Sequence, residues 1–173
     1  WSDTIANDLK WGAITASSGM ALSSHGENFG VALVESLRCA RPVLTTYKVN
    51  IYKDEQFKPE FKKISPFSKI PVIIDHETKT SLFESGAILI YLGEKSGKFY
   101  KKSQRTIINQ WLMGQMGYVG PMLGQHHQFH HYNPGKSKFG EERYFNIAKR
   151  LYKDLDEHLF KSDFLAGKKY SIA

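Results

Sequence analysis

Short apolar runs separated by polar stretches dominate the first part of the chain. Residues 19–24 form one such run, and residues 43–51 are rich in β-branched and aromatic side chains, so each predicts a strand. Residues 31–40 instead repeat apolar side chains at helical spacing, and Pro42 ends this predicted helix. Residues 1–17 are small and polar without periodicity, and we expect an arm or a loop there.

A hairpin and a longer helix follow a predicted short helix near residues 59–63. Residues 71–75 are a compact apolar run, residues 76–80 a polar turn, and residues 81–83 resume the strand. The next segment, residues 85–97, reads as a helix that begins with serine and ends at glycine. The order strand, helix, strand, hairpin, helix is typical of an α/β thioredoxin-like domain.

The pattern changes to helical spacing alone in the second part of the chain. Residues 104–119 predict a helix interrupted by glycines, and residues 139–160 predict a strongly amphipathic helix. The face that we expect this second helix to bury consists of Tyr144, Ala148, Leu151, Tyr152, Leu155 and Leu159. An all-α C-terminal domain therefore follows the α/β one.

These patterns place a domain boundary near residues 98–104. We expect an arm over residues 1–17, a thioredoxin-like domain over 18–100 and a helical domain over 104–173. The chain stops two residues after Ser171, although a serine before apolar residues usually begins a helix. We therefore expect a fragment, truncated within the helical domain.

Composition and charge narrow the classes of partner. Hydrophobic residues make up 41% of the chain and aromatic residues 13%, which is typical of a globular protein. The net charge is +7, but the basic residues are scattered, so we expect no nucleic-acid partner. Because the chain has neither a bilayer-spanning apolar run nor a secretory signal, we expect no membrane association. The single cysteine, Cys39, favours a reducing compartment, and we expect a cytoplasmic protein.

The first candidate feature for chemistry is the dipeptide Ile70-Pro71, which directly precedes a predicted strand. Proline cannot donate a ladder hydrogen bond. A cis bond at this position would leave the backbone N–H and C=O of Ile70 free to pair with an extended peptide ligand. The alternative is an ordinary edge proline.

The second feature is Glu84-Ser85 at the start of the predicted helix. Free N–H groups and the Ser85 hydroxyl suit a carboxylate, and the Glu84 carboxylate suits an ammonium group. The alternative is an ordinary helix N-cap. Because one hairpin joins this pair to Pro71, a single peptide ligand with an amino-acid head group could contact both features.

Three longer segments carry a family resemblance that covers about residues 47–173. Residues 57–99 (FKPEFKKISPFSKIPVIIDHETKTSLFESGAILIYLGEKSGKF) resemble the N-terminal signature of glutathione transferases. Residues 110–134 (QWLMGQMGYVGPMLGQHHQFHHYNP) and 141–159 (EERYFNIAKRLYKDLDEHL) resemble the nu-class bacterial glutathione-dependent disulfide-bond oxidoreductases and their fungal nitrogen-regulator relatives.

The resemblance implies the glutathione transferase fold, a homodimer and glutathione as cosubstrate. It further implies a thiol–disulfide oxidoreductase or transferase, in which the thiolate of bound glutathione attacks a small disulfide or an electrophile. The alternative is a non-catalytic glutathione-binding or regulatory protein of the same fold. The implied glutathione-binding residues are Gln56, Ile70, Pro71, Glu84, Ser85 and Arg143.

The expected catalytic group near the glutathione sulfur is Asn28. The family places Thr-Pro-Asn-Gly after the first strand, whereas this chain has Glu-Asn-Phe-Gly at residues 27–30. Ser23 and Ser24 are weaker candidates. A carboxylate at Glu27 would oppose the formation of a thiolate, which needs a donor or a positive potential.

The remaining candidate residues are explained by structural roles and not by catalysis or metal binding. Cys39 sits late in a predicted helix, so buried packing is favoured over catalysis. Trp111, Met113 and Met116 are expected in the core. Histidines pair at i, i+4 spacing, but no acidic residue or cysteine accompanies them, so we expect no metal and place them near the second substrate. These histidines are His126, His127, His130 and His131.

Overall fold

The protein, represented by a computed structural model, is described for residues 20–24 and 43–173 and divides into two compact units. The first unit is Trp1–Lys58 and the second is Pro59–Ala173. The predicted arm, the predicted helix over 31–40, and Cys39 lie outside the described residues. The predicted domain boundary near residues 98–104 stays a prediction.

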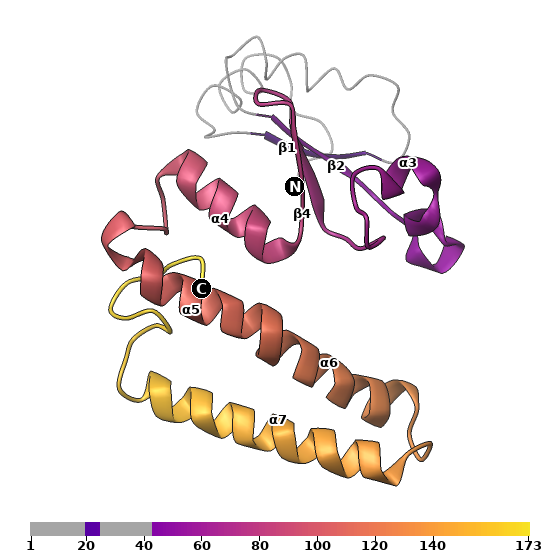
Figure 1. Cartoon of the computed structure of the whole chain (residues 1–173), viewed down its shortest axis with the longest axis vertical. Helices are drawn as coiled ribbons and strands as arrows, with labels where there is room; N and C mark the ends of the chain where they lie inside the picture. The colour runs from indigo at the N-terminus through magenta and orange to yellow at the C-terminus, as the bar shows by residue number, and fades with distance from the viewer. Residues whose placement is uncertain (1–19, 25–42) are drawn as a thin grey trace, which may run out of the picture. The chain divides into compact units, whose positions relative to one another are not determined.

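The described part of the first unit contains two parallel strands (Figure 1). β1 (Met20–Ser24) pairs with β2 (Val43–Tyr47), and Met20 lies opposite Val43. Both predicted strands are confirmed, but β2 ends four residues early. The reason is local, because the Asn50 side chain accepts a hydrogen bond from the backbone N–H of Tyr52 at 3.1 Å and begins a 3₁₀ turn.

The described part of the first unit ends with two short 3₁₀ turns, η1 (Ile51–Lys53) and η2 (Glu55–Phe57). The Glu55 carboxylate accepts a hydrogen bond from the backbone N–H of Asn50 at 2.6 Å, which closes this loop on itself.

The second unit begins with the short helix α3 (Pro59–Lys62) and an antiparallel hairpin, β3 (Val72–Asp75) and β4 (Thr80–Phe83). The predicted hairpin is confirmed. α4 (Ser85–Ser96) follows β4 directly and ends at Gly97, whose φ of 67° requires the left-handed conformation that glycine adopts without strain.

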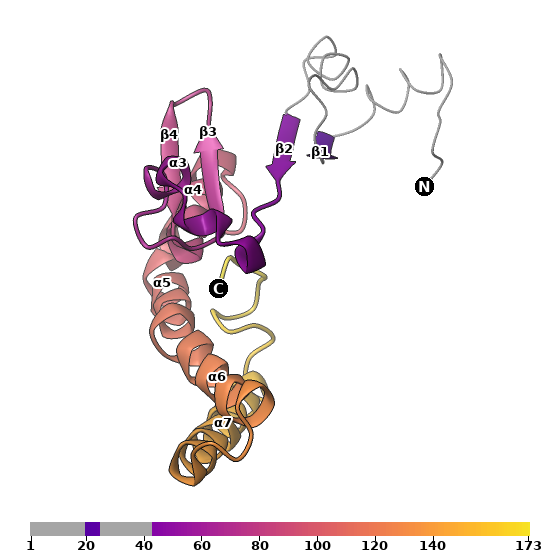
Figure 2. The same cartoon turned by 90° about the vertical axis from the view of Figure 1, so that its right-hand side faces the viewer.

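Helices continue the second unit as far as Leu159, and residues 160–173 after them are irregular. The helical segment from residue 105 to 132 runs antiparallel to the last helix, residues 138–159 (Figures 1 and 2). The elements are η3 (Lys102–Gln104), α5 (Arg105–Gly114), η4 (Gln115–Val119), α6 (Gly120–His127), η5 (Gln128–Tyr132) and α7 (Lys138–Leu159). η4 and η5 are π-helical turns that continue α5 and α6 without a break. The predicted helix over 104–119 therefore extends to Tyr132, and the helical rod from α5 to η5 lies between α4 and α7.

A small buried cluster holds α4 and α5 to the C-terminal segment. Tyr100, Ile108 and Ala166 are its buried members, and Ile90 of α4 and Trp111 of α5 pack against it. Apolar side chains from segments far apart in sequence thus meet at one place, which fixes the direction of α4 relative to α5.

α7 is confirmed as a helix, but its expected buried face is partly wrong. Ala148 and Leu151 are buried, whereas Tyr152 is 62% exposed and Leu159 is 46% exposed. Ile147, which the expected face left out, is buried. Successive residues are about 100° apart around a helix, so Tyr152 points well away from the direction shared by Ile147 and Leu151.

Within the described ranges, no helix combines the length and the apolar character needed to cross a membrane.

Candidate functional site

A hydrogen-bonded loop fixes the chain in front of Pro71. Ser65 is buried, and its hydroxyl donates to the carbonyl of Lys69 at 2.8 Å and accepts from the Lys69 N–H at 3.0 Å. The backbone N–H of Ser68 donates to the Ser65 carbonyl at 2.9 Å. These bonds leave little freedom for the two residues that follow, Ile70 and Pro71.

The backbone of Ile70 is available for a ligand. The Ile70–Pro71 peptide bond is cis, and the Ile70 side chain is 52% exposed. Among the described residues, no hydrogen bond involves the N–H or the C=O of Ile70. Because Pro71 carries no N–H, β3 begins only at Val72, and the edge at Ile70 can accept an extended peptide.

The hairpin brings Pro71 and Glu84 to the same end of the sheet. Val72 lies opposite Phe83 in the register. One further step in each strand places Pro71 opposite Glu84, and directly opposed residues of an antiparallel pair have Cα atoms about 4.5–5.5 Å apart. Glu84 is exposed, with φ 68° and ψ 116°.

The start of α4 lacks a conventional cap. Glu84 occupies the N-cap position, and its side chain makes no capping hydrogen bond. Ser85 is the first helical residue, and its hydroxyl donates to the sulfur of Met116 at 3.4 Å rather than capping the helix. The ordinary N-cap interpretation is therefore wrong, and the first backbone N–H groups of α4 point to the end of the hairpin where Glu84 lies.

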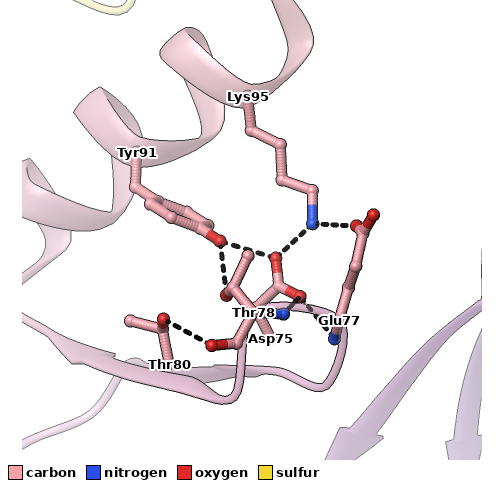
Figure 3. Close-up of polar contacts among 6 residues, drawn as sticks. All are labelled: Asp75, Glu77, Thr78, Thr80, Tyr91 and Lys95. Carbon is pink, nitrogen blue, oxygen red and sulfur yellow. Dashed lines mark hydrogen bonds and ion pairs between the residues drawn. The ribbon is translucent and has the colours of Figure 1, made fainter.

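A polar network ties the opposite end of the hairpin to the second half of α4 (Figure 3). Asp75 accepts a hydrogen bond from the hydroxyl of Tyr91 at 2.7 Å and forms an ion pair with Lys95. Lys95 also pairs with Glu77 at 2.6 Å, and Tyr91 contacts the Thr78 hydroxyl at 3.0 Å. Hydrogen bonds from Lys95, which has the larger effect, and from the Tyr91 hydroxyl hold the pKa of Asp75 well below its ordinary value. Because α4 is fixed at both ends, the position of Ser85 is set by the hairpin.

Gln56 belongs to the first unit, and the expected catalytic group lies outside the described residues. Gln56 is in η2 of the first unit, where its Nε2 donates to the carbonyl of Ile51 at 3.4 Å. Its Oε1 is buried and, within the described residues, has no hydrogen-bond partner. Asn28 and Glu27 lie outside the described residues. The roles of Gln56 and Asn28 stay predictions.

Arg143 is exposed on α7. Its guanidinium lies 6.0 Å from the ring of Tyr144, and among the described residues no hydrogen bond or ion pair joins it to Ile70, Glu84 or Ser85. The rod from α5 to η5 separates α7 from α4 (Figure 1). The structure thus brings four of the six predicted binding residues to one end of the hairpin and leaves the role of Arg143 a prediction.

Sequence reasoning placed Met113 wrongly, because it is 50% exposed instead of buried. Met116 is half-buried and packs against the start of α4. No local signal marks this contact, because it joins residues 31 positions apart.

The histidines form two ring pairs near the end of the helical rod. The ring centroids of His126 and His130 are 4.4 Å apart, and those of His127 and His131 are 4.6 Å apart. In the part of the chain that the structure describes, no group of three or more ligand side chains could hold a metal ion. The pKa of His126 is lowered chiefly by burial and, to a smaller extent, by the charges of the neighbouring His130 and His127.

The chain is similar to known proteins in sequence and in fold. Residues 43–94 match the model of the glutathione S-transferase N-terminal domain. The disulfide-bond oxidoreductase YfcG of Escherichia coli is 47% identical over 133 residues, which are 73% of this chain and 62% of that protein. The protein URE2 of Meyerozyma guilliermondii is 32% identical, over 79% of this chain and 48% of that protein.

A solved structure extends the similarity to three dimensions. The crystal structure of a glutathione transferase from Burkholderia graminis, with two glutathione molecules bound per subunit, superposes with a TM-score of 0.70. It is 36% identical and aligns with 78% of this chain and 59% of that one. The chain thus spans between about half and three fifths of the length of these relatives. Together with the hairpin and helix described above, these similarities show that the chain belongs to the glutathione transferase family.

Proposed function

We propose that this chain binds glutathione at the end of the hairpin formed by Ile70, Pro71, Glu84 and Ser85, and that it serves as a glutathione-dependent thiol–disulfide oxidoreductase. The observation that carries the proposal is the register of β3 and β4. This register supports one site, in which the unpaired N–H and C=O of Ile70 and the start of α4, which has no side-chain cap, lie at the same end of the hairpin.

Each part of this site matches one part of the ligand. The N–H and C=O of Ile70 would pair with the cysteinyl backbone of glutathione, as a short added strand. The γ-glutamyl head group carries both an ammonium and a carboxylate. The ammonium suits Glu84, and the carboxylate suits the Ser85 hydroxyl and the free N–H groups of α4.

The chemistry follows from the bound thiol. The glutathione thiolate attacks one sulfur of a small disulfide, forms a mixed disulfide and expels the other sulfur as a thiolate. A second glutathione thiolate then attacks the mixed disulfide, which yields glutathione disulfide and releases the second thiolate of the substrate. The similarity to a disulfide-bond oxidoreductase favours this reaction over conjugation to an electrophile.

Further parts of the proposal rest on the family resemblance. Asn28 would stabilise the thiolate, and Gln56 and Arg143 would contact glutathione. The chain would act as a homodimer in the cytoplasm, with a thioredoxin-like domain over residues 18–100 and a helical domain over 104–173. The single cysteine is in keeping with a reducing compartment.

The experiment combines calorimetric titration with glutathione and turnover of hydroxyethyl disulfide. We expect binding at millimolar glutathione or below, together with turnover. Ser85→Ala should lose about 1.5–3 kcal/mol of binding free energy, because it removes a hydrogen bond to a charged group. Ser81→Ala, an exposed serine on β4, is the matched control and should bind like the wild type.

Three other outcomes would count against the proposal. Absence of binding at millimolar glutathione refutes it as a whole. Binding without turnover leaves the non-catalytic glutathione-binding protein. Equal affinity of Ser85→Ala and the wild type means that glutathione binds at a different place.

A further inference from the structure

The hydroxyl of Ser85 already has a partner inside the protein. It donates to the sulfur of Met116 at 3.4 Å, and this is its only hydrogen bond within the described residues. The two residues are 31 positions apart, and Met116 belongs to the helical rod rather than to the hairpin and α4. A side chain of the helical part thus reaches the proposed head-group site directly.

The contact is close and is built into the backbone. An ideal Cβ placed on Gly86, the second residue of α4, would lie 3.0 Å from Cγ and 3.3 Å from Sδ of Met116. A side chain at residue 86 would therefore press on Met116, which would have to shift by a few tenths of an ångström. Met116 itself lies in η4, a π-helical turn, and such turns inside α-helices are frequent at functional sites.

We propose that the thioether of Met116 competes with the γ-glutamyl carboxylate of glutathione for the Ser85 hydroxyl, and that Met116 is thereby a positioning residue that sets glutathione affinity. This inference rests on the proposed function, because it assumes that Ser85 donates to the bound head group.

The competition follows from the chemistry of the three groups. A serine hydroxyl has one hydrogen to donate, so a strong bond to one acceptor weakens the bond to another. A thioether sulfur is a weak acceptor, whereas a carboxylate accepts a shorter and stronger charge-assisted bond. Met116 therefore keeps the half-buried hydroxyl satisfied in the free protein and releases it when the carboxylate arrives.

Two substitutions at Met116 should change affinity in opposite directions. Met116→Leu keeps the volume but removes the acceptor, which destabilises the free state alone and should tighten glutathione binding about threefold. Met116→Gln supplies a stronger acceptor of similar length and should weaken binding by a similar factor. Met113→Leu makes the same chemical change in α5, where Met113 is 50% exposed and its Cε also lies near the first turn of α4, 3.8 Å from an ideal Cβ on Gly86. Because the Ser85 hydroxyl bonds to Met116 and not to Met113 within the described residues, Met113→Leu controls for packing alone and should leave affinity unchanged.

The measurement is calorimetric titration with glutathione, alongside the kinetics of hydroxyethyl disulfide reduction. Both Met116 variants should change KM for glutathione and leave kcat unaltered, because the lost or gained bond is absent from the bound state. In the Ser85→Ala background, both effects should vanish, since the contested hydroxyl is gone. A purely packing role of Met116 would weaken binding in both variants and would persist in that background.

The outcomes separate this inference from the proposed function. Weaker or unchanged binding of Met116→Leu overturns the competition, and so does an effect that survives in the Ser85→Ala background. If Met116→Leu fails to fold, Met116→Gln decides: unchanged or tighter binding overturns the competition, and so does a weakening that persists in the Ser85→Ala background. Wild-type affinity in Ser85→Ala alone would instead refute the proposed site.

Discussion

Replacing a glycine in a helix with alanine usually stabilises a protein. In α4 we predict the opposite, because this helix packs closely against Tyr100. Gly93 is a buried residue of α4, and an ideal Cβ placed there would lie 2.7 Å from Cβ of Tyr100. Ordinary van der Waals contact lies at 3.4–4 Å. Because the opposing atom is bound directly to the backbone of a buried residue, Tyr100 cannot turn away without a shift of the chain.

Two effects of Gly93→Ala oppose each other. Alanine in a helix interior is more favourable than glycine by about 1 kcal/mol. Overpacking costs about 1–3 kcal/mol, and a contact this short belongs at the upper end of the range. We therefore expect the free energy of unfolding to fall by roughly 2 kcal/mol, with the clash outweighing the helical gain.

The assay is urea unfolding followed by far-ultraviolet circular dichroism, and Gly124→Ala is the matched control. Gly124 lies within α6, and an added Cβ there meets nothing within 4 Å. The same substitution should raise stability there by about 0.5–1 kcal/mol. If Gly93→Ala stabilises the protein as much as Gly124→Ala does, α4 does not pack on Tyr100 as described.

Two predictions concern pH. The pKa of Asp75 is held low chiefly by Lys95, so the stabilisation from this contact is present above the ordinary pKa and is lost as pH falls below it. Asp75→Asn should therefore lower the urea midpoint at neutral pH and lower it less near pH 3, and an equal loss at both values would contradict the network. Burial, then His130, lowers the pKa of His126, so protonation below about pH 6.5 destabilises the fold. His126→Gln should flatten the fall in stability between about pH 7 and pH 5, and an unchanged slope would contradict burial of the neutral ring.

Local signals made the hairpin and α4 predictable from the sequence. Pro71 and the apolar run after it mark the start of β3, and Gly97 marks the end of α4. Ser137 begins α7 as an N-cap, with its hydroxyl accepting from the N–H of Gly140 at 3.1 Å. Each of these effects acts within a few residues, which is the range that a sequence pattern describes.

Contacts between distant segments were not predictable. Nothing near Met116 in the sequence indicates that its sulfur meets Ser85, because the contact depends on how the helical rod crosses the first turn of α4. The continuation of the rod to Tyr132 was also missed, since glycine and histidine lower helix propensity while packing against α7 overrides it. The burial of Tyr152 on α7 was predicted wrongly for a related reason. Helical spacing shows which apolar side chains lie on one face, but the elements that pack against the helix decide how much of that face is buried.

The most direct test of the central claim is a crystal structure of this chain with glutathione bound. We predict that the cysteinyl backbone pairs with the N–H and C=O of Ile70, that the γ-glutamyl carboxylate accepts from the Ser85 hydroxyl, and that this hydroxyl has left Met116. Glutathione bound elsewhere, with the Ser85 hydroxyl still on the sulfur of Met116, would contradict the account.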